Sequence, residues 1–431
     1  MTQSASPQEY HPRTENKLFL VYNSVLIGEI TRKKNNKYAL RYYDSVTGET
    51  WFTALSIGLP KGAVRHDSDH IRWWLAALLP DRPPLLMRWR KEFGVTDLEP
   101  FELLKWVGED IAGAFQLVRD ERLDTVLKET QSLTPLSHAE IASRLAQAKA
   151  DIPIKTSNGR GRFSLPGAQA KVALNRTAGE WFDPEGRTPS THILKPAVPG
   201  YIDQDLCEFM TMTAAQLMGL VAAESAIRQF EEERAFVSKR YDRIYDSEAW
   251  IRVHQEDICQ AMGRDPYFKY ESQGGPGAAG VARLLRDHCS DPETDCQRFT
   301  QALIFNWLIC GGDAHSRNYS LLLVRDEVRL APLYDLNGQL AFGRPSEVDL
   351  AMSINGKFEA VSVTTRDWLA FADRLFVDAE WLAEELARQI SVLPDVIATT
   401  ATLPAVSESS SSMPGRYVDA VAEWCISRAD V

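Results

Sequence analysis

The chain has 431 residues, of which 44% are hydrophobic and 25% charged, and its formal net charge is −11. With 10% aromatic residues it can bury enough apolar surface to offset chain entropy, which excludes a disordered chain. The longest apolar runs, at 73–79 and 302–310, are much shorter than the ~20 residues of a membrane-spanning helix, so we expect no membrane partner. The acidic balance disfavours a dedicated nucleic-acid-binding protein, because the chain as a whole repels phosphate.

The cysteine pattern and the amino terminus predict a cytoplasmic protein. The 6 cysteines are scattered without a C-x-x-C pair, and His288-Cys289 with Cys296 lacks a partner pair at zinc-ligand spacing. The opening residues, MTQSASPQEYHPRTENK, are polar and lack the apolar region of a secretory signal. Free thiols in a chain without such a signal are typical of a reducing compartment.

After a polar tail at 1–16, the first part of the chain is expected to be an α+β unit over 17–125. Two β-rich runs around Asn23-Ser24 predict a hairpin within a small sheet. Farther along the apolar spacing becomes helical, and Gly94 is placed to end one of these helices. The expected strands are 18–30 (as the hairpin), 38–44 and 51–59, and the expected helical segments are 71–80, 83–94 and 100–118.

The rest of the chain changes from further strands to a mostly helical half. The Gly-, Ser- and Arg-rich stretch 151–166 predicts an exposed loop, and beyond Trp250 the apolar residues repeat at helical period almost to the end. Within this part we expect strands at 172–176, 191–196 and 236–241, a helix at 206–220, a hairpin at 319–333, and loops at 274–277 and 407–415. A small sheet followed by a helical half is the coarse shape of a two-lobed α+β kinase. The expected domains are 17–150, 151–245 and 246–431.

Three segments carry residue types suited to phosphoryl transfer. They are GDAHSRN at 312–318, LYDL at 333–336, and SLPGAQAK at 164–171 with Lys195 downstream. The reaction requires a backbone cradle, a cation on the phosphates, oxygen ligands for Mg²⁺ and a carboxylate that accepts the acceptor's proton. A carboxylate five residues before an asparagine, followed later by a second carboxylate, matches the D-x-x-x-x-N … D order of protein kinases.

Each of these residues also has an ordinary structural interpretation. Asp313 and Asn318 are of types that cap helices and form turns, and Asp335 could start a turn. His315 on a loop is more often a hydrogen-bonded structural residue, and a strand lysine such as Lys195 is usually solvated. The glycine-containing loop is not a Walker A sequence. The order of all the elements, rather than any one of them, favours the phosphotransfer hypothesis.

These motifs resemble those of the HipA family, the serine/threonine kinases that act as toxins of bacterial toxin–antitoxin modules. LLPDRPP and PFELLKWVGEDIAGAFQLV are similar to the family's N-terminal subdomain. The motifs SLPGAQAK, THILKP, RYDR, HQEDICQAMG, KYESQGGPG, NWLICGGDAHSRN and APLYD follow in the order of its kinase core. The resemblance spans nearly the whole chain and implies a two-lobed, protein-kinase-like α+β fold.

The resemblance also implies a role for each matching residue. Asp313 would be the catalytic base, Asn318 and Asp335 would hold Mg²⁺, and Lys195 would contact the ATP phosphates. The loop that covers the phosphates would comprise Pro166, Gly167, Ala168, Gln169, Ala170 and Lys171. The other residues of the nucleotide site would be Lys239, Arg240 and Tyr241 in the hinge, His315, Ser316 and Arg317 in the catalytic loop, and Tyr334 beside Asp335.

Two further residues have implied roles outside direct nucleotide contact. Ser164 would be the serine that the family autophosphorylates, which ejects the loop and switches the kinase off. The neighbouring Arg160 and Arg162 are candidate partners of that phosphate. Glu208 lies where the glutamate that pairs with the kinase lysine should fall, although an exposed acid that favours the helix dipole is an equal alternative.

The sequence departs from the ordinary kinase pattern in places. Gly311-Gly312 precede Asp313 where H-R-D is typical, and Tyr334-Asp335-Leu336 replaces D-F-G; both match the family's own usage. In 353–364 only Lys357 is basic, whereas some members use a lysine cluster on operator DNA. We therefore expect contact with operator DNA only indirectly, through an antitoxin.

The leading hypothesis is an ATP- and Mg²⁺-dependent serine/threonine protein kinase that arrests growth as a toxin. By family analogy its target would be an aminoacyl-tRNA synthetase, such as the glutamyl enzyme, and its partner a HipB-like helix-turn-helix antitoxin. The alternative is a catalytically silent corepressor or scaffold that holds an antitoxin. A third hypothesis is a metal-dependent hydrolase that uses Asp313, His315 and Asp335.

Overall fold

The computed structural model describes residues 16–150, 163–198 and 200–429, so most of the expected tail and of the 151–166 loop, with Arg160 and Arg162, lies outside the described residues. The first sheet has the strand order β3-β2-β1-β4. Its predicted hairpin is confirmed, since β1 and β2 pair antiparallel and Asn23 and Ser24 take the positive φ angles (42° and 78°) of a tight turn. The strands are β1 (Lys17–Tyr22), β2 (Val25–Arg32), β3 (Tyr38–Tyr42) and β4 (Phe115–Val118).

Helices pack on this sheet much as their apolar spacing predicts. The helix α2 buries Ile71, Trp74 and Leu75 in the core of the sheet. Gly94, with φ of 66°, ends α3 in the left-handed conformation that glycine adopts without strain. The helices of this part are α1 (Asp44–Thr47), α2 (Ser68–Ala77), α3 (Pro83–Phe93), α4 (Pro100–Val107) and α5 (Asp120–Lys128).

The strand predicted at 51–59 is wrong, because this segment is an irregular loop over the core. Its apolar side chains Phe52, Leu55 and Leu59 are fully buried, at spacings of three and four rather than in alternation. Side chains replace a strand ladder here: the Tyr42 hydroxyl accepts from the Leu55 amide (2.8 Å) and donates to the Leu59 carbonyl (2.9 Å).

The helical prediction for 100–118 is correct only for its first half. The helix α4 ends at Val107, and β4 pairs antiparallel with β1. Farther along, Gly113 has φ of 83°, which no α-helix allows, so the helix could not have continued to residue 118. All four residues of β4 are buried, the polar Gln116 among them, so this segment is a strand covered on both faces rather than part of a helix.

The second sheet has six strands in the order β5-β7-β6-β8-β10-β9. Its predicted strands are confirmed, and α6 packs on it through Ile141 and Leu145. The sheet begins with β5, before the domain boundary that we placed at residue 150. Its elements are β5 (Gln131–Pro135), α6 (His138–Lys149), β6 (Val172–Thr177), β7 (Glu180–Gly186), β8 (His192–Pro196), β9 (Ser225–Phe230) and β10 (Glu233–Lys239).

The remaining chain is mostly helical, as expected, and contains one large core. The predicted helix at 206–220 is α7 (Gln204–Leu217), and the other helices are α8 (Ile258–Ala261), α9 (Ala278–His288), α10 (Pro292–Leu308), α11 (Thr365–Leu375), α12 (Ala379–Ala401), α13 (Pro404–Ser407) and α14 (Met413–Ala429). The strands are β11 (Arg243–Tyr245), β12 (Trp250–Arg252), β13 (His254–Asp257), β14 (Ser320–Val324), β15 (Glu327–Leu330), β16 (Asp349–Ile354) and β17 (Lys357–Glu359). The predicted hairpin is β14–β15, whereas the helical expectation directly after Trp250 is wrong, because β12 and β13 occupy that stretch.

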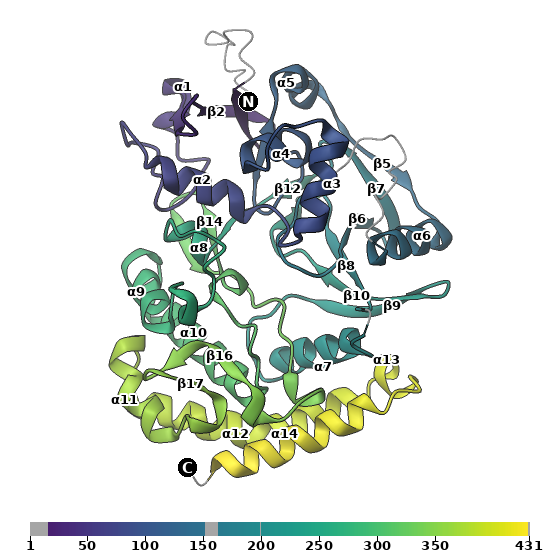
Figure 1. Ribbon diagram of the computed structural model, residues 1–431, viewed down its shortest axis with the longest axis vertical. Coiled ribbons are helices and arrows are strands. Elements are labelled where there is room, and N and C mark those ends of the chain that lie inside the picture. Colours follow the sequence, from purple (N-terminus) through teal and green to yellow (C-terminus); the bar gives the residue numbers. More distant parts are fainter. Residues whose placement is uncertain (1–15, 151–162, 199, 430–431) are drawn as a thin grey trace.

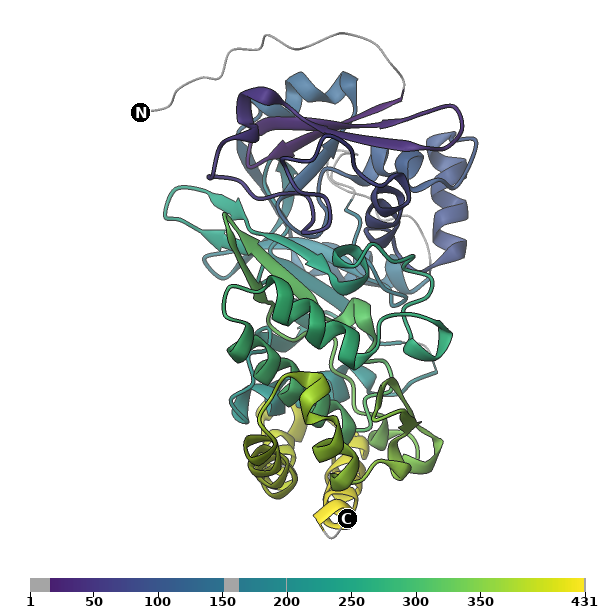
Figure 2. The ribbon, with the colours of Figure 1, turned by 90° about the vertical axis from the view of Figure 1, so that its left-hand side faces the viewer.

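Figures 1 and 2 show the first sheet at one end of the molecule and helices α12 and α14 at the other, with the six-stranded sheet between them. In the part of the chain that the structure describes, no helix is long and apolar enough to cross a membrane.

The first part of the chain is joined to the rest by polar contacts along β13. The Glu256 carboxylate accepts from the Ile57 amide (2.9 Å), and His254 Nε2 lies 2.9 Å from the Leu55 carbonyl oxygen. Gln260, on the short helix α8 that follows β13, donates to the Trp74 carbonyl (3.0 Å). Burial, with Asp257 nearby, raises the pKa of Glu256 to about 8, so that its carboxyl is mostly protonated at neutral pH.

Glu256 predicts a pH dependence of stability. Its pKa is about 8 in the folded protein and about 4.3 in an unfolded chain. Between these values the folded state binds more protons, so this group makes the free energy of unfolding fall as pH rises, by up to about 1.4 kcal/mol per pH unit. Glu256→Gln should remove that slope and be more stable than wild type at alkaline pH. Urea unfolding at about pH 6 and about pH 9 measures this, with Glu384→Gln on the exposed face of α12 as control; equal slopes for all three proteins would contradict it.

Candidate active site

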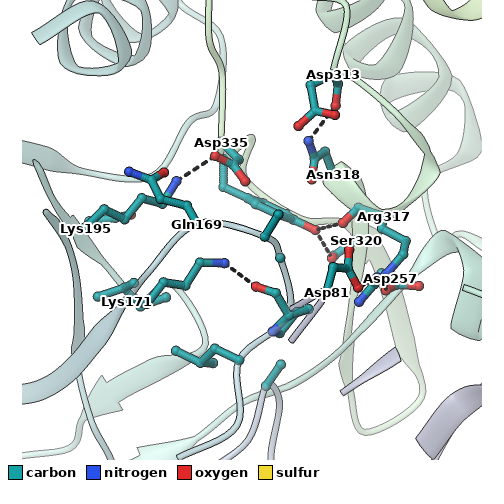
Figure 3. A pocket seen from close by; sticks show the side chains of 18 of the residues that line it. Asp81, Gln169, Lys171, Lys195, Asp257, Asp313, Arg317, Asn318, Ser320 and Asp335 are labelled. Carbon is teal, nitrogen blue, oxygen red and sulfur yellow. Dashed lines mark hydrogen bonds and ion pairs between the residues drawn. The ribbon is translucent and has the colours of Figure 1, made fainter. Parts of the chain in front are cut away.

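A cavity of about 500 Å³ lies where the first part of the chain, the six-stranded sheet and the helical half meet. Of the base and nucleotide-site residues named above, all but Ala170 and Ser316 line it. Figure 3 shows Lys195, Asp335, Asp313 and Asn318 around this space, although they come from widely separated parts of the sequence. The fold therefore gathers most of the predicted residues into one cleft.

Lys195 lies at the centre of a buried charge triad. It is on β8, and its ammonium nitrogen is 2.5 Å from Glu208 Oε1 on α7 and 2.6 Å from Asp335 Oδ1. The predicted pairing of Glu208 with Lys195 is thereby confirmed, and the exposed-acid alternative is wrong, since Glu208 is 1% exposed. Two carboxylates hold the lysine in one position, which an active kinase requires of its phosphate-binding lysine.

The two carboxyl groups of the triad are in different electrostatic states. Burial opposes ionisation of both, and it raises the pKa of Glu208 to about 7. At Asp335 the ammonium groups of Lys195 and Lys171 outweigh burial and hold the pKa below its usual range. Asp335 is therefore the permanently ionised group at this edge of the cavity.

Asp335 also has an unusual backbone conformation. Its φ of 58° lies in the left-handed region, which is uncommon for residues other than glycine. The preceding Tyr334 anchors this turn, because its hydroxyl donates to the Arg317 carbonyl (2.8 Å) and hydrogen-bonds to Ser320 Oγ (2.7 Å). The strain is held where the carboxylate meets the lysine, a common location for strained residues in active sites.

Asp313 lies on the loop that follows α10, on the other side of the cavity from Lys195 (Figure 3). Its carboxylate accepts a short hydrogen bond from the Tyr270 hydroxyl and lies 3.6 Å from His315 Nε2. The side chain remains 58% exposed, so the carboxylate is open to the cleft. His315 is buried, and burial, with Lys269 and Arg317 nearby, lowers its pKa to about 3, so its ring is neutral.

Asn318 and Asp335 have the ligand atoms that Mg²⁺ prefers. The Asn318 amide nitrogen donates to the Asp313 carbonyl (2.7 Å), which leaves its side-chain oxygen for a cation. Asp335 contributes an ionised carboxylate to the same cavity. An amide oxygen and a carboxylate are hard ligands that suit Mg²⁺ together with phosphate oxygens and water.

Residues 166–169 and 171 of the predicted phosphate loop line the cavity. Gly167 has φ of 107°, a conformation that L side chains rarely adopt, so the backbone favours glycine at this position. Lys171 donates to the Pro166 carbonyl, and burial lowers its pKa to about 8. Ser164 is fully buried and its hydroxyl donates to the Leu78 carbonyl (2.7 Å).

The predicted hinge residues border the cavity, but their side chains have other partners. Lys239 pairs with Glu224 (2.9 Å), and the Tyr241 hydroxyl donates to Gln255. The Arg240 guanidinium is buried and turned toward Asp242, with contacts of 2.9 and 3.0 Å. The Arg240 side chain therefore already has a buried partner, although the residue borders the cavity.

Three residues predicted for the nucleotide site either do not line the cavity or have a side chain paired within the protein. Ser316 is buried and its hydroxyl donates to the Lys269 carbonyl (2.9 Å). Ala170 does not line the cavity. Arg317 borders the cavity, but its guanidinium pairs with Asp81 (2.5 Å) and Asp257 (3.3 Å). The side chains of Ser316 and Arg317 thus hold the catalytic loop in place.

Sequence reasoning missed three residues that contact the catalytic loop. They are Asp81, Lys269 and Tyr270. Tyr270 stands in KYESQGGPG, whose presence marked the segment as special without indicating a contact with Asp313. Nothing in the spacing relates Asp81 to Arg317, because the two residues are 236 positions apart.

Comparison with known proteins identifies the relatives of this chain. A family model described as the HipA-like C-terminal domain matches residues 163–397, which is more than half of the chain. The chain belongs to the HipA family. The HipA N-terminal domain model matches residues 18–118 of the same chain. The predicted resemblance is confirmed over both parts.

Individual HipA relatives agree with this assignment. The serine/threonine-protein kinase toxin HipA of Shewanella oneidensis is 31% identical over 365 residues, which cover 81% of this chain and 82% of that protein. Y4mE of Sinorhizobium fredii is 30% identical over 376 residues, covering 86% of this chain and 89% of its own. The solved structure of Shewanella oneidensis MR-1 HipA with HipB and operator DNA matches with a TM-score of 0.82 and 27% identity, over 96% of this chain and 99% of that one. This HipA-family chain is thus a protein kinase with a two-lobed α+β fold.

Proposed function

We propose that this chain is an ATP- and Mg²⁺-dependent serine/threonine kinase and acts as the toxin of a toxin–antitoxin system. The observation that carries the proposal is that the Lys195–Glu208–Asp335 triad shares one cavity with Asp313 and Asn318. This is the arrangement that phosphoryl transfer needs: a fixed cation, an ionised metal-binding carboxylate and a separate carboxylate open to an acceptor. A protein that only held a partner would have no physical need for it.

Each group in the cavity has a proposed task. Lys195 binds phosphate oxygens of ATP, while the loop from Pro166 to Lys171 covers them. Asn318 and Asp335 would hold Mg²⁺, whose contribution when bound is to neutralise phosphate charge. Asp313 orients the acceptor hydroxyl and receives its proton. The Tyr270 hydroxyl donates to one carboxylate oxygen of Asp313, and the side chain stays 58% exposed, so an acceptor hydroxyl can still reach the carboxylate.

We further propose the chain's partners and organisation. The solved relative is bound to HipB and operator DNA, and a HipB-like helix-turn-helix antitoxin is the proposed partner here. Lys357 pairs with Asp367 (2.8 Å), which supports contact with operator DNA through the antitoxin only. The proposed target is an aminoacyl-tRNA synthetase, such as the glutamyl enzyme, in the cytoplasm. The proposed parts are an N-terminal subdomain, an N-lobe beginning near β5 rather than at 151, and a C-lobe from 246.

Phosphate transfer by the purified chain tests this proposal. With ATP and Mg²⁺ it should phosphorylate serine or threonine residues of specific proteins in a bacterial lysate, identified by mass spectrometry. The Asp313→Asn variant is the matched control and should leave those proteins unmodified. A chain that binds the antitoxin but transfers no phosphate would instead support the scaffold alternative. Phosphate transfer that is unchanged by chelating Mg²⁺ would contradict the metal assignment.

We propose Ser164 as the regulatory autophosphorylation site. Its hydroxyl is fully buried against Leu78, so a doubly charged phosphate cannot be accommodated there and would keep the loop unseated. Ser164→Ala should therefore transfer phosphate to other proteins while gaining none at this position, and its activity should not decline during incubation with ATP. Intact-mass and peptide mass spectrometry measure both. A wild-type chain that stays unmodified at Ser164 while phosphorylating other proteins would contradict this assignment.

A further inference from the structure

The end of α2 contacts both the phosphate loop and the catalytic loop of the proposed active site. We define the α2 clasp as residues 77–81, the last residue of that helix and the four that follow. Its main-chain carbonyl groups accept from Arg317 Nη2 at Ala77 (2.8 Å) and from the Ser164 hydroxyl at Leu78 (2.7 Å). The Asp81 amide donates to the Gly167 carbonyl (3.1 Å), where Pro80 and Gly167 form a parallel bridge. One short segment thus binds the phosphate loop and the catalytic loop together.

The Asp81 side chain completes the clasp with two ion pairs. One carboxylate oxygen lies 2.5 Å from Arg317 Nη1 and the other 3.0 Å from Lys269 Nζ. Lys269 precedes Tyr270, which hydrogen-bonds to Asp313, so Asp81 braces the loop of the proposed base from two sides. These cations hold the pKa of Asp81 below its usual range even though burial opposes ionisation. The carboxylate is 30% exposed at the cavity, and the Arg317 guanidinium behind it is buried.

We infer that Asp81 is a positioning residue of the kinase. Through Asp81, the N-terminal part of the chain links the position of the phosphate loop to the geometry of the catalytic loop. The inference rests on the proposed function, because it assumes that Asp313 and the 166–171 loop serve catalysis and ATP binding. Asp81 itself contacts neither proposed reacting group. Its effect runs through Arg317 and Lys269 on one side, and through its own backbone and Gly167 on the other.

The inference predicts a combined kinetic defect for Asp81→Asn. The variant keeps the side-chain shape but loses the charge that holds two cations, so the catalytic loop should shift slightly. Misplacement of about 1 Å can cost up to roughly a hundredfold in rate, and we expect kcat to fall about tenfold or more. The KM for ATP should rise several-fold, because a shift of residue 81 would weaken the hydrogen bond between its amide and the Gly167 carbonyl in the phosphate loop. Both constants are measured with a protein acceptor found in the lysate experiment, and amide exchange in residues 163–171 should quicken.

Matched variants separate positioning from a general loss of stability. Asp97→Asn breaks another Asp–Arg pair of the same part of the chain, with Arg32 at 2.8 Å, and should leave kcat, KM and exchange in the loop unchanged. Asp81→Glu keeps the charge and should restore much of the activity. If Asp81→Asn does not fold, Lys269→Gln, which removes one of the two ion pairs, should move kcat and KM in the same direction by a smaller factor.

The outcomes distinguish this inference from the proposed function. The positioning role would be overturned if Asp81→Asn had wild-type kinetics, or if Asp81→Asn and Asp97→Asn had equal defects. If Asp81→Asn cannot fold, wild-type kinetics for Lys269→Gln would overturn it. Absence of phosphate transfer by the wild-type chain would overturn the proposed function instead. In that case the role of the α2 clasp is tested by the affinity for ATP. If Asp81→Asn bound ATP as tightly as wild type, the positioning role would be overturned as well.

Discussion

Asp313→Asn is expected to reduce the rate of phosphate transfer by about 10²–10⁴-fold, the range typical of losing a general base. Asparagine has the same shape as aspartate but cannot accept the acceptor's proton. ATP binding should be nearly unchanged, because the Lys195 triad and the phosphate loop do not depend on this carboxylate. Steady-state phosphorylation of a lysate-derived acceptor measures kcat, and fluorescence titration measures the affinity for ATP.

The matched control for this variant is Asp326→Asn. Asp326 is exposed in the turn between β14 and β15, in the hairpin that follows the catalytic loop. It should have wild-type kinetics. If Asp313→Asn transferred phosphate as fast as Asp326→Asn, Asp313 would be removed from the mechanism, whatever the similarity of this chain to other kinases.

Asp242→Asn is expected to lower the free energy of unfolding by about 3–5 kcal/mol, the cost of removing one partner from a buried ion cluster. The Asp242 carboxylate accepts from Arg240 (2.9 and 3.0 Å) and lies 2.9 Å from Arg243. It also accepts from the Gly113 amide (2.8 Å), which ties the first part of the chain to the segment after β10. These arginines, although burial opposes ionisation, hold the pKa of Asp242 well below its usual range.

The reason for this large cost is the excess of buried cations. Without Asp242, the side chains of Arg240, Arg243 and Arg252 would share Asp110 alone, at distances of 3.4–3.8 Å. Urea unfolding followed by circular dichroism measures the loss. Asp395→Asn, on the exposed face of α12, is the control and should change stability by less than about 0.5 kcal/mol. Equal unfolding midpoints for the two variants would show that the cluster does not stabilise the fold.

Local chemistry made several elements predictable from the sequence. The Asn23-Ser24 turn between apolar runs specified the first hairpin, and Gly94 specified the end of α3, because few residues tolerate a positive φ. The strands framing the phosphate loop and the β14–β15 hairpin were likewise visible in their patterns. In each case the signal lies within about ten residues, where backbone preference and side-chain alternation act directly.

The wrong assignments share a cause that is not local. Residues 51–59 carry strand-forming side chains, yet the Leu55 amide and the Leu59 carbonyl hydrogen-bond to the Tyr42 hydroxyl rather than to a neighbouring strand. Residues 115–118 are apolar except for Gln116, a pattern that suits a buried helix or a buried strand equally well. This segment forms a strand because it can pair with the edge of β1, and that edge exists only once the sheet has assembled.

The same division applies to the candidate site. The sequence by itself determined the family, the fold class and the identity of Lys195, Asp313, Asn318 and Asp335 as the residues to examine, because their order along the chain reflects the chemistry of phosphate transfer. Only the tertiary structure decided that Arg317 and Ser316 have buried partners within the protein, that Tyr270 hydrogen-bonds to Asp313 and that Asp81 braces the catalytic loop. Contacts across more than two hundred residues arise from packing, and no periodicity or spacing in a single chain records which charges packing will bring together.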